Sequence, residues 1–220
     1  YEKISAGLVK LGLTASIVDP CLFISPKVQC ILYVDDCLWF YKNKQDLDAI
    51  LKSFEEDGDK YNWEMKVEGS VKEYLGIDVK QTGNGFQLFQ GGLIKKILAA
   101  TNMSDCNGKV TPTNTDKPLG TDANGRPARY QWTHPSVVGM LMYLAANSRP
   151  EIQFAVHQCA QFTHNYKAFH EDAIIRIWCF LQEPKEKGGL AINPSKNMEI
   201  DCYVDASFAG LYRHEDEKDP

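Results

Sequence analysis

Short apolar runs separated by polar residues fill the stretch from 21 to 41, a pattern typical of antiparallel strands. The segments 29–34 and 37–41 are rich in β-branched and aromatic residues, and Asp35 and Asp36 lie between them. Two such runs joined at a polar pair predict a β-hairpin with two carboxylates at its tip. The run 21–24 predicts a further short strand before this hairpin.

Apolar residues recur at helical spacing in much of the remaining chain. Asn43 and Asp46 resemble an N-cap and a charged N3 residue, and the helix that follows is expected to end near Gly58. By the same patterns we predict helices at 2–13, 92–100, 136–147, 151–162 and 170–182, and strands at 61–67, 74–80, 86–90, 190–192 and 198–204.

The order of these elements predicts an α+β fold. Gly, Pro, Thr, Asn and Asp dominate from 107 to 130, so this stretch is expected to be a linker or extended loop. It separates an α+β part, 1–106, from a helical block, 131–189. The segment 190–220 begins with strands and ends in an acidic tail, so it is expected to enter a second αβ unit that stops early.

The composition is that of a globular protein, with 220 residues of which 44% are hydrophobic and 24% charged. No apolar segment is long enough to span a bilayer. Seven cysteines without a Cys-x-x-Cys pair indicate reduced thiols and an intracellular protein. The net charge of −5 argues against strong autonomous binding to nucleic acid, for which a basic surface supplies most of the affinity.

The acidic hairpin tip is the main candidate for chemistry. Adjacent carboxylates repel each other unless water or a cation compensates them, and Mg2+ prefers oxygen ligands. In polymerases, paired metal ions clamp the attacking and leaving oxygens of a phosphoryl transfer. The simpler interpretation is a solvated turn, because Asp is common in turns. However, Asn-Gly or Asp-Gly would suit a tight hairpin better than Asp35-Asp36.

Several phrases in a fixed order make the chain resemble the reverse transcriptase of copia-type LTR retrotransposon Pol polyproteins. The resemblance covers Tyr1 to about Leu211 and continues into the start of the ribonuclease H domain of that family. The phrases that carry it are Asp19–Phe23, Leu32–Asp36, Trp63–Lys66, Tyr74–Asp78, Gly139–Leu144, Ser148–Ile152, Phe154–Val156 and Cys202–Ala206.

The resemblance implies the role of each residue in the acidic hairpin. Asp35 and Asp36 would hold Mg2+ for nucleotidyl transfer to a primer 3′-hydroxyl, at the two-metal site expected in the complete parent enzyme. Tyr33 and Val34 would lie near the incoming nucleotide or the primer end. The RNA template, the DNA primer in its RNA–DNA hybrid, the deoxynucleotide and the rest of the Pol polyprotein would then be partners.

The resemblance also implies roles outside the hairpin. Leu75 and Gly76 resemble the primer grip, where a small residue lets the backbone approach nucleic acid closely. Lys66 would donate a proton to the leaving pyrophosphate, although a lone Lys is more often a solvated charge. Asp205 matches the first metal-binding aspartate of ribonuclease H, although a single Asp at a strand end is more often structural.

The implied architecture is the C-terminal part of a polymerase palm with a small thumb, then a helical connection, then the first strand of a ribonuclease H-like fold. Relatives carry a further metal-binding aspartate and basic fingers upstream of the hairpin, and no residue before Asp35 matches that aspartate. We therefore expect the fragment to be inactive alone. The implied location is intracellular, either cytoplasmic in a virus-like particle or nuclear, in a eukaryotic host and away from membranes.

Two other classes of function stay open from the sequence. The chain is either a non-catalytic relic or a binding module that contacts an RNA–DNA hybrid or a partner polypeptide. The other class is a zinc module built from His157, Cys159, His164 and His170. Their spacing does not fit zinc, because residues two apart on a helix point to different faces.

Overall fold

The computed structural model divides the chain into two compact units, Tyr1–Val71 and Lys72–Pro220. The boundary lies just before the predicted strand 74–80, and the predicted linker 107–130 falls inside the second unit. The structure describes residues 1–61, 66–83, 85–101, 103, 106–114, 119–130, 132–182, 188–194, 202 and 204.

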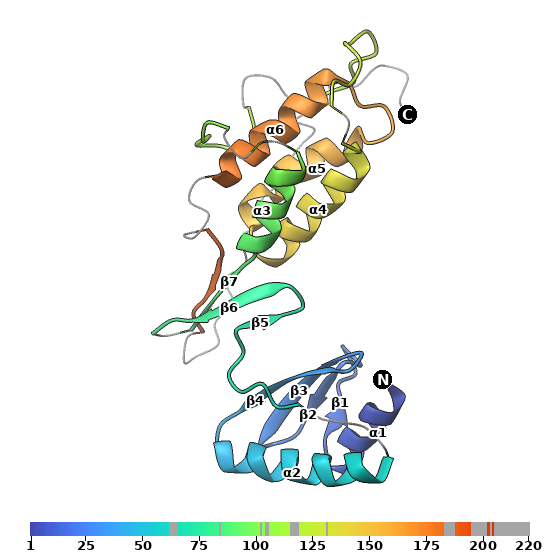
Figure 1. Cartoon of the computed structure of the whole chain (residues 1–220), viewed down its shortest axis with the longest axis vertical. Coiled ribbons are helices and arrows are strands. Elements are labelled where there is room, and N and C mark those ends of the chain that lie inside the picture. Colours follow the sequence, from blue (N-terminus) through green and yellow to red (C-terminus); the bar gives the residue numbers. More distant parts are fainter. Residues whose placement is uncertain are drawn as a thin grey trace. The chain divides into compact units, whose positions relative to one another are not determined.

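The first unit is a four-stranded antiparallel sheet with two helices (Figure 1). The strands lie in sequence order, and the helices pack on one face of the sheet. The elements are α1 (Glu2–Lys10), β1 (Thr14–Ala15), β2 (Leu22–Ile24), β3 (Val28–Tyr33), β4 (Asp36–Tyr41) and α2 (Lys44–Tyr61).

Strict alternation along β3 builds the core of this unit. Val28, Cys30 and Leu32 are buried, whereas the residues between them turn to the other face. The buried residues pack with Leu8 of α1 and Phe54 of α2, and Phe54 meets Trp39 edge-on at 6.4 Å between ring centroids. Burial of the inward set therefore fixes the register of the hairpin β3–β4, because a slip of one residue would expose all of it.

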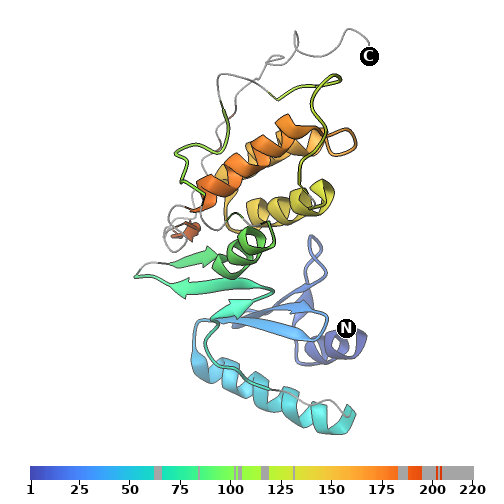
Figure 2. The same ribbon diagram turned by 45° about the horizontal axis from the view of Figure 1, so that its top comes forward.

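The second unit combines another four-stranded antiparallel sheet with a group of helices (Figures 1 and 2). Its sheet contains β5 (Glu73–Tyr74), β6 (Ile77–Gln81), β7 (Phe86–Phe89) and β8 (Leu190–Ile192). Strand β8 pairs with β7, with Leu88 opposite Leu190. The helices are α3 (Gly91–Ala100), α4 (His134–Asn147), η1 (Pro150–Ile152), α5 (Gln153–Gln161) and α6 (Ala168–Gln182).

The core of the second unit lies among α3, α4, α5 and α6. Its largest buried side chain is Trp178 of α6, which Trp132 contacts edge-on at 5.1 Å between ring centroids. Leu141, Leu144 and Ile174 are also fully buried in this cluster. The apolar stripes that predicted helices in this block therefore face one another.

Most elements predicted from the periodicity are present, with ends shifted by a few residues. Asn43 caps α2 as predicted, because its side-chain oxygen accepts the Gln45 amide at 3.0 Å. The strand predicted for 61–67 is wrong where the structure can be compared, because α2 continues past Gly58 to Tyr61 and residues 66–67 are not in a strand. One glycine costs a helix only about 1 kcal/mol and did not end it.

The predicted strand 198–204 lies almost entirely outside the described residues. Among the helices that the structure describes, none is both long enough and apolar enough to cross a membrane.

Candidate functional site

The acidic hairpin is built as the sequence predicts, with a two-residue turn. Tyr33 is paired with Asp36, and Val34 and Asp35 form the turn between them. Val34 has a φ of 57°, in the left-handed region that β-branched residues rarely adopt. A positive φ at the first turn position suits the twist of a tight hairpin. Holding a non-glycine residue there costs about 1–2 kcal/mol, and such strain gathers at functional sites.

The register determines where the side chains of this hairpin lie. Directly opposed residues share a face, so Tyr33 and Asp36 lie together on the face turned away from the core of the unit. Tyr33 is 54% exposed and Val34 59% exposed, and both aspartates are exposed. The structure thus brings four of the predicted site residues together at one accessible tip.

A pair of thiols lies under the tip, on the opposite face. Cys30 and Cys37 occupy diagonal positions on the buried side of β3 and β4, and their side chains are hydrogen-bonded. This hydrogen bond raises the pKa of Cys30 and lowers the pKa of Cys37, against the effects of burial and of Asp36 and Asp35 on Cys37. The hairpin that carries Asp35 and Asp36 therefore has the two thiols and the Trp39 ring on its core side, packed with the ring of Phe54.

The donor set at the tip fits a magnesium ion. Two exposed carboxylates supply hard oxygen ligands, and Mg2+ in nucleotide sites usually takes one or two carboxylates together with substrate phosphates and water. Within the described residues, neither Asp35 nor Asp36 has an ion pair or hydrogen bond that would occupy its oxygens. No group of three or more His, Cys, Asp or Glu side chains in that part of the chain is placed to hold a metal ion.

The predicted primer-contacting residues form a second tight turn, in the second unit. Leu75 and Gly76 join β5 to β6, with Tyr74 opposite Ile77. Both turn residues have positive φ, 53° for Leu75 and 75° for Gly76, as a type I′ hairpin requires. Gly76 suits this conformation without steric cost, whereas Leu75 does not.

A contact that the sequence did not predict holds this turn. The Tyr143 hydroxyl of α4 donates to the Leu75 carbonyl at 2.8 Å. Local patterns do not reveal a hydrogen bond between residues 68 positions apart; the sequence offered a tyrosine within the apolar run 137–146 and nothing about its partner.

Among the described residues, the remaining predicted site residue, Lys66, is not part of either turn. Lys66 lies in the coil after α2, where its ammonium contacts the Glu68 carboxylate at 2.9 Å, and this hydrogen bond raises the pKa of Lys66. Asp205 lies outside the described residues. The four residues of the zinc alternative are divided, since His157 and His164 are exposed while Cys159 and His170 are buried. These four residues therefore form no metal site, because no three His, Cys, Asp or Glu side chains among the described residues are placed to hold a metal ion.

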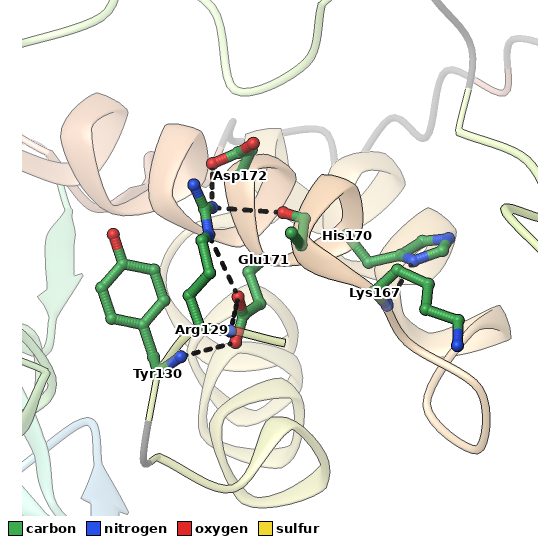
Figure 3. Close-up of polar contacts among 7 residues, drawn as sticks. Arg129, Tyr130, Lys167, His170, Glu171 and Asp172 are labelled. Carbon is green, nitrogen blue, oxygen red and sulfur yellow. Dashed lines mark hydrogen bonds and ion pairs between the residues drawn. The ribbon is translucent and has the colours of Figure 1, made fainter. Parts of the chain in front are cut away.

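A polar clamp anchors the segment before α4 (Figure 3). Glu171 is fully buried and accepts the backbone amides of Arg129 at 2.7 Å and Tyr130 at 3.2 Å. The Arg129 guanidinium lies 3.5 Å from the same carboxylate and also contacts Asp172 and the Ala168 carbonyl. The hydrogen bond to Asp172 raises the pKa of Arg129, and burial lowers it by less. The nearby Tyr130 and Glu171 add smaller increases. Sequence patterns gave no sign of this clamp.

Comparison with known proteins adds a family assignment to this geometry. Residues 1–115 match the family described as reverse transcriptase (RNA-dependent DNA polymerase). The chain is 27% identical to the retrovirus-related Pol polyprotein from transposon RE2 of Arabidopsis thaliana, over 96% of this chain and 14% of that protein. It is 26% identical to the retrovirus-related Pol polyprotein from transposon TNT 1-94 of Nicotiana tabacum, over 96% of this chain and 16% of that protein.

A shorter relative is an uncharacterized mitochondrial protein of Arabidopsis thaliana, 28% identical over 82% of this chain and 71% of that protein. The chain thus spans about one seventh of the polyproteins that it resembles, since its match to transposon RE2 covers 14%. No solved structure matches the chain significantly.

Proposed function

Because the chain belongs to the reverse transcriptase (RNA-dependent DNA polymerase) family, we propose that it forms the part of an RNA-directed DNA polymerase that binds catalytic Mg2+ and the primer end. The observation that carries the proposal is the exposed tip at which Tyr33, Val34, Asp35 and Asp36 meet. The match to Pol polyproteins over 96% of the chain confirms the resemblance to copia-type elements. The continuation into ribonuclease H stays a prediction.

The proposed chemistry assigns a separate task to each part of the tip. The carboxylates of Asp35 and Asp36 would hold Mg2+, which when bound stabilises negative charge on the reacting phosphoryl oxygens. Tyr33 shares the face of Asp36 and would pack against the primer end or the nucleotide. The buried hydrophobic side of the hairpin keeps the carboxylates in place, and catalysis of phosphoryl transfer depends mainly on positioning.

Metal binding tests the first part of the proposal. Mn2+ serves as a paramagnetic substitute for Mg2+, and its binding is measured by water proton relaxation with a deoxynucleotide present. We expect Asp35→Asn and Asp36→Asn each to weaken Mn2+ binding at least tenfold, because each removes a negative oxygen ligand. Asp48→Asn, a change at an exposed carboxylate of α2, serves as the matched control and is expected to leave binding unchanged. Equal Mn2+ affinity in all variants would refute the proposed metal site.

Primer extension tests the activity of the chain itself. We propose that the isolated chain is inactive, because the family resemblance implies a third metal-binding carboxylate and no group of three acids is found within the described residues. Radiolabelled primer on an RNA template should stay unextended with Mg2+ and all four deoxynucleotides. Extension by the purified chain that Asp35→Asn abolishes would overturn this expectation while supporting the polymerase assignment.

A further inference from the structure

Tyr143 contacts the Leu75–Gly76 turn through a hydrogen bond of its hydroxyl group. Its hydroxyl donates to the Leu75 carbonyl at 2.8 Å, while 44% of the tyrosine surface stays exposed. Tyr143 belongs to α4, which is anchored by the buried residues Leu141 and Leu144 on either side. Because α4 is held by its buried side chains, the Tyr143 hydroxyl is held in place beside the β5–β6 turn.

This hydrogen bond sets the orientation of one peptide plane. The Leu75 carbonyl and the Gly76 amide belong to the same planar trans peptide, so the Gly76 N–H points away from the carbonyl and hence away from Tyr143. Gly76 is exposed, and a Cβ built on it meets no atom within 4 Å. The turn thus presents a backbone donor with open space over the glycine.

We infer that Tyr143 is a positioning residue for primer binding: it holds the Leu75–Gly76 peptide so that the Gly76 amide donates to a phosphate oxygen of the primer strand. Backbone N–H groups are frequent phosphate ligands, and they fix the register of a nucleic acid without reading its sequence. The inference rests on the proposed function, because it takes the Leu75–Gly76 turn to be a primer contact. It adds a residue 68 positions away that controls the contact.

The test measures binding of the whole chain to an RNA–DNA hybrid with a recessed DNA 3′ end, by fluorescence anisotropy at low salt. Tyr143→Phe removes only the hydroxyl and should weaken binding about 3- to 10-fold, as expected for one lost hydrogen bond. Gly76→Asn tolerates positive φ but fills the open space, and it should weaken binding at least as much. Tyr41→Phe, at a tyrosine 50% exposed in the first unit, is the control and should bind like the wild type.

Two further readouts separate positioning from a general loss of stability. Hydrogen exchange at the Gly76 amide should be faster in Tyr143→Phe, while the unfolding midpoint stays near that of the wild type. Primers in which one phosphate at a time is replaced by a neutral methylphosphonate should reveal one linkage to which the wild type is sensitive. Tyr143→Phe should no longer respond to that linkage.

The outcomes distinguish this inference from the function on which it rests. Unchanged binding by Tyr143→Phe, with binding weakened by Gly76→Asn, would overturn the role of Tyr143 and leave the primer contact standing. No effect of either variant would overturn both the primer contact and the inference. Absence of hybrid binding by the wild-type chain even at low salt would overturn the proposed function, and the inference with it.

Discussion

Val34 shows how a single residue can store strain beside a proposed catalytic pair. Its φ of 57° is unfavourable for a branched side chain, yet the paired strands on both sides impose the turn. Val34 directly precedes the two aspartates, so its conformation sets the direction in which the chain presents them. The strain is consistent with selection for position rather than for stability.

Relief of this strain is measurable. We expect Val34→Asn to increase the free energy of unfolding by about 1 kcal/mol, because Asn tolerates the left-handed region far better than Val. Urea unfolding followed by circular dichroism measures the change. Val18→Asn is the matched control, since Val18 is 93% exposed and does not have a positive φ. A Val34→Asn protein with a lower free energy of unfolding would contradict this expectation. It would show that the contacts of the Val34 side chain stabilise the fold by more than its positive φ destabilises it.

His134 is a second residue whose environment has a measurable consequence. It is fully buried and stacked between Trp132 and Tyr166, with ring centroids at 6.3 and 4.5 Å. Neither of its ring nitrogens has a hydrogen-bond partner among the described residues. Burial, and then the nearby His170, lower the pKa of His134 to about 4, although Glu171 acts in the opposite direction.

Acid should therefore destabilise the second unit as the pH falls below the ordinary pKa of histidine. The unfolded chain binds a proton at His134 near pH 6.5, whereas the folded chain binds it only near pH 4. The free energy of unfolding should thus fall as the pH drops from about 6.5 to about 4, by at most about 1.4 kcal/mol per pH unit from this group. His170, whose pKa is also lowered, adds to the same trend.

Denaturant unfolding over this pH range measures the effect. His134→Phe keeps the stacked ring but cannot be protonated, so its stability should depend less on pH. His157→Gln changes an exposed histidine on α5 and should leave the pH dependence as it is. Parallel curves for His134→Phe and the wild type would contradict the assignment.

At the scale of elements, polar contacts between distant segments hold the helices of the second unit. The Glu171 clamp attaches residues 129–130 to the start of α6. The Ser148 hydroxyl, at the end of α4, donates to the buried Gln90 side chain at 2.9 Å, directly before α3. Arg149 is 3% exposed, forms an ion pair with Glu151 and lies over the Phe180 ring. The Glu171 clamp, the Ser148–Gln90 hydrogen bond and the Arg149–Phe180 contact thus each link segments that are distant in the sequence.

The clamp should be costly to break. Glu171→Gln replaces a carboxylate oxygen by an NH2 group that cannot accept a backbone amide, so one buried donor loses its partner. We expect a loss of about 2–4 kcal/mol in the free energy of unfolding. Asp172→Asn, at a side chain 56% exposed, is the control and should cost less than about 1 kcal/mol. Equal effects of the two substitutions, measured by urea unfolding, would refute the role assigned to burial.

At the scale of the whole molecule, the chain has two compact units: the acidic hairpin tip belongs to the first and the Leu75–Gly76 turn to the second. Substitutions in separate units with no shared contacts should act independently. We therefore expect Val34→Asn and Glu171→Gln to change the free energy of unfolding additively, within about 0.5 kcal/mol. A double variant whose effect departs by more than 1 kcal/mol from the sum would indicate energetic coupling between the units.

The sequence was sufficient where local patterns decide the structure. Two apolar runs joined at a polar pair predicted the hairpin that carries Asp35 and Asp36, and helical spacing predicted α3 to α6. It failed at the end of α2, where one glycine was given too much weight. Contacts such as Tyr143 with Leu75 and Glu171 with Arg129 were not predictable, because they depend on tertiary packing over 68 and 42 positions.

The pairing of β7 with β8 has a consequence for the way this protein is made. Strand β7 ends at Phe89 and its partner begins at Leu190, so the ribosome must synthesise α3, α4, α5 and α6 before these two strands can pair. Until then one edge of β7 is open to other chains, as any unpaired edge strand is. The closing step also demands glycine at Gly189, where an ideal Cβ would lie 2.5 Å from the Leu88 carbonyl oxygen. A ribosome that stalls between these strands would therefore hold a nascent chain prone to aggregation, and completion of this sheet should await β8.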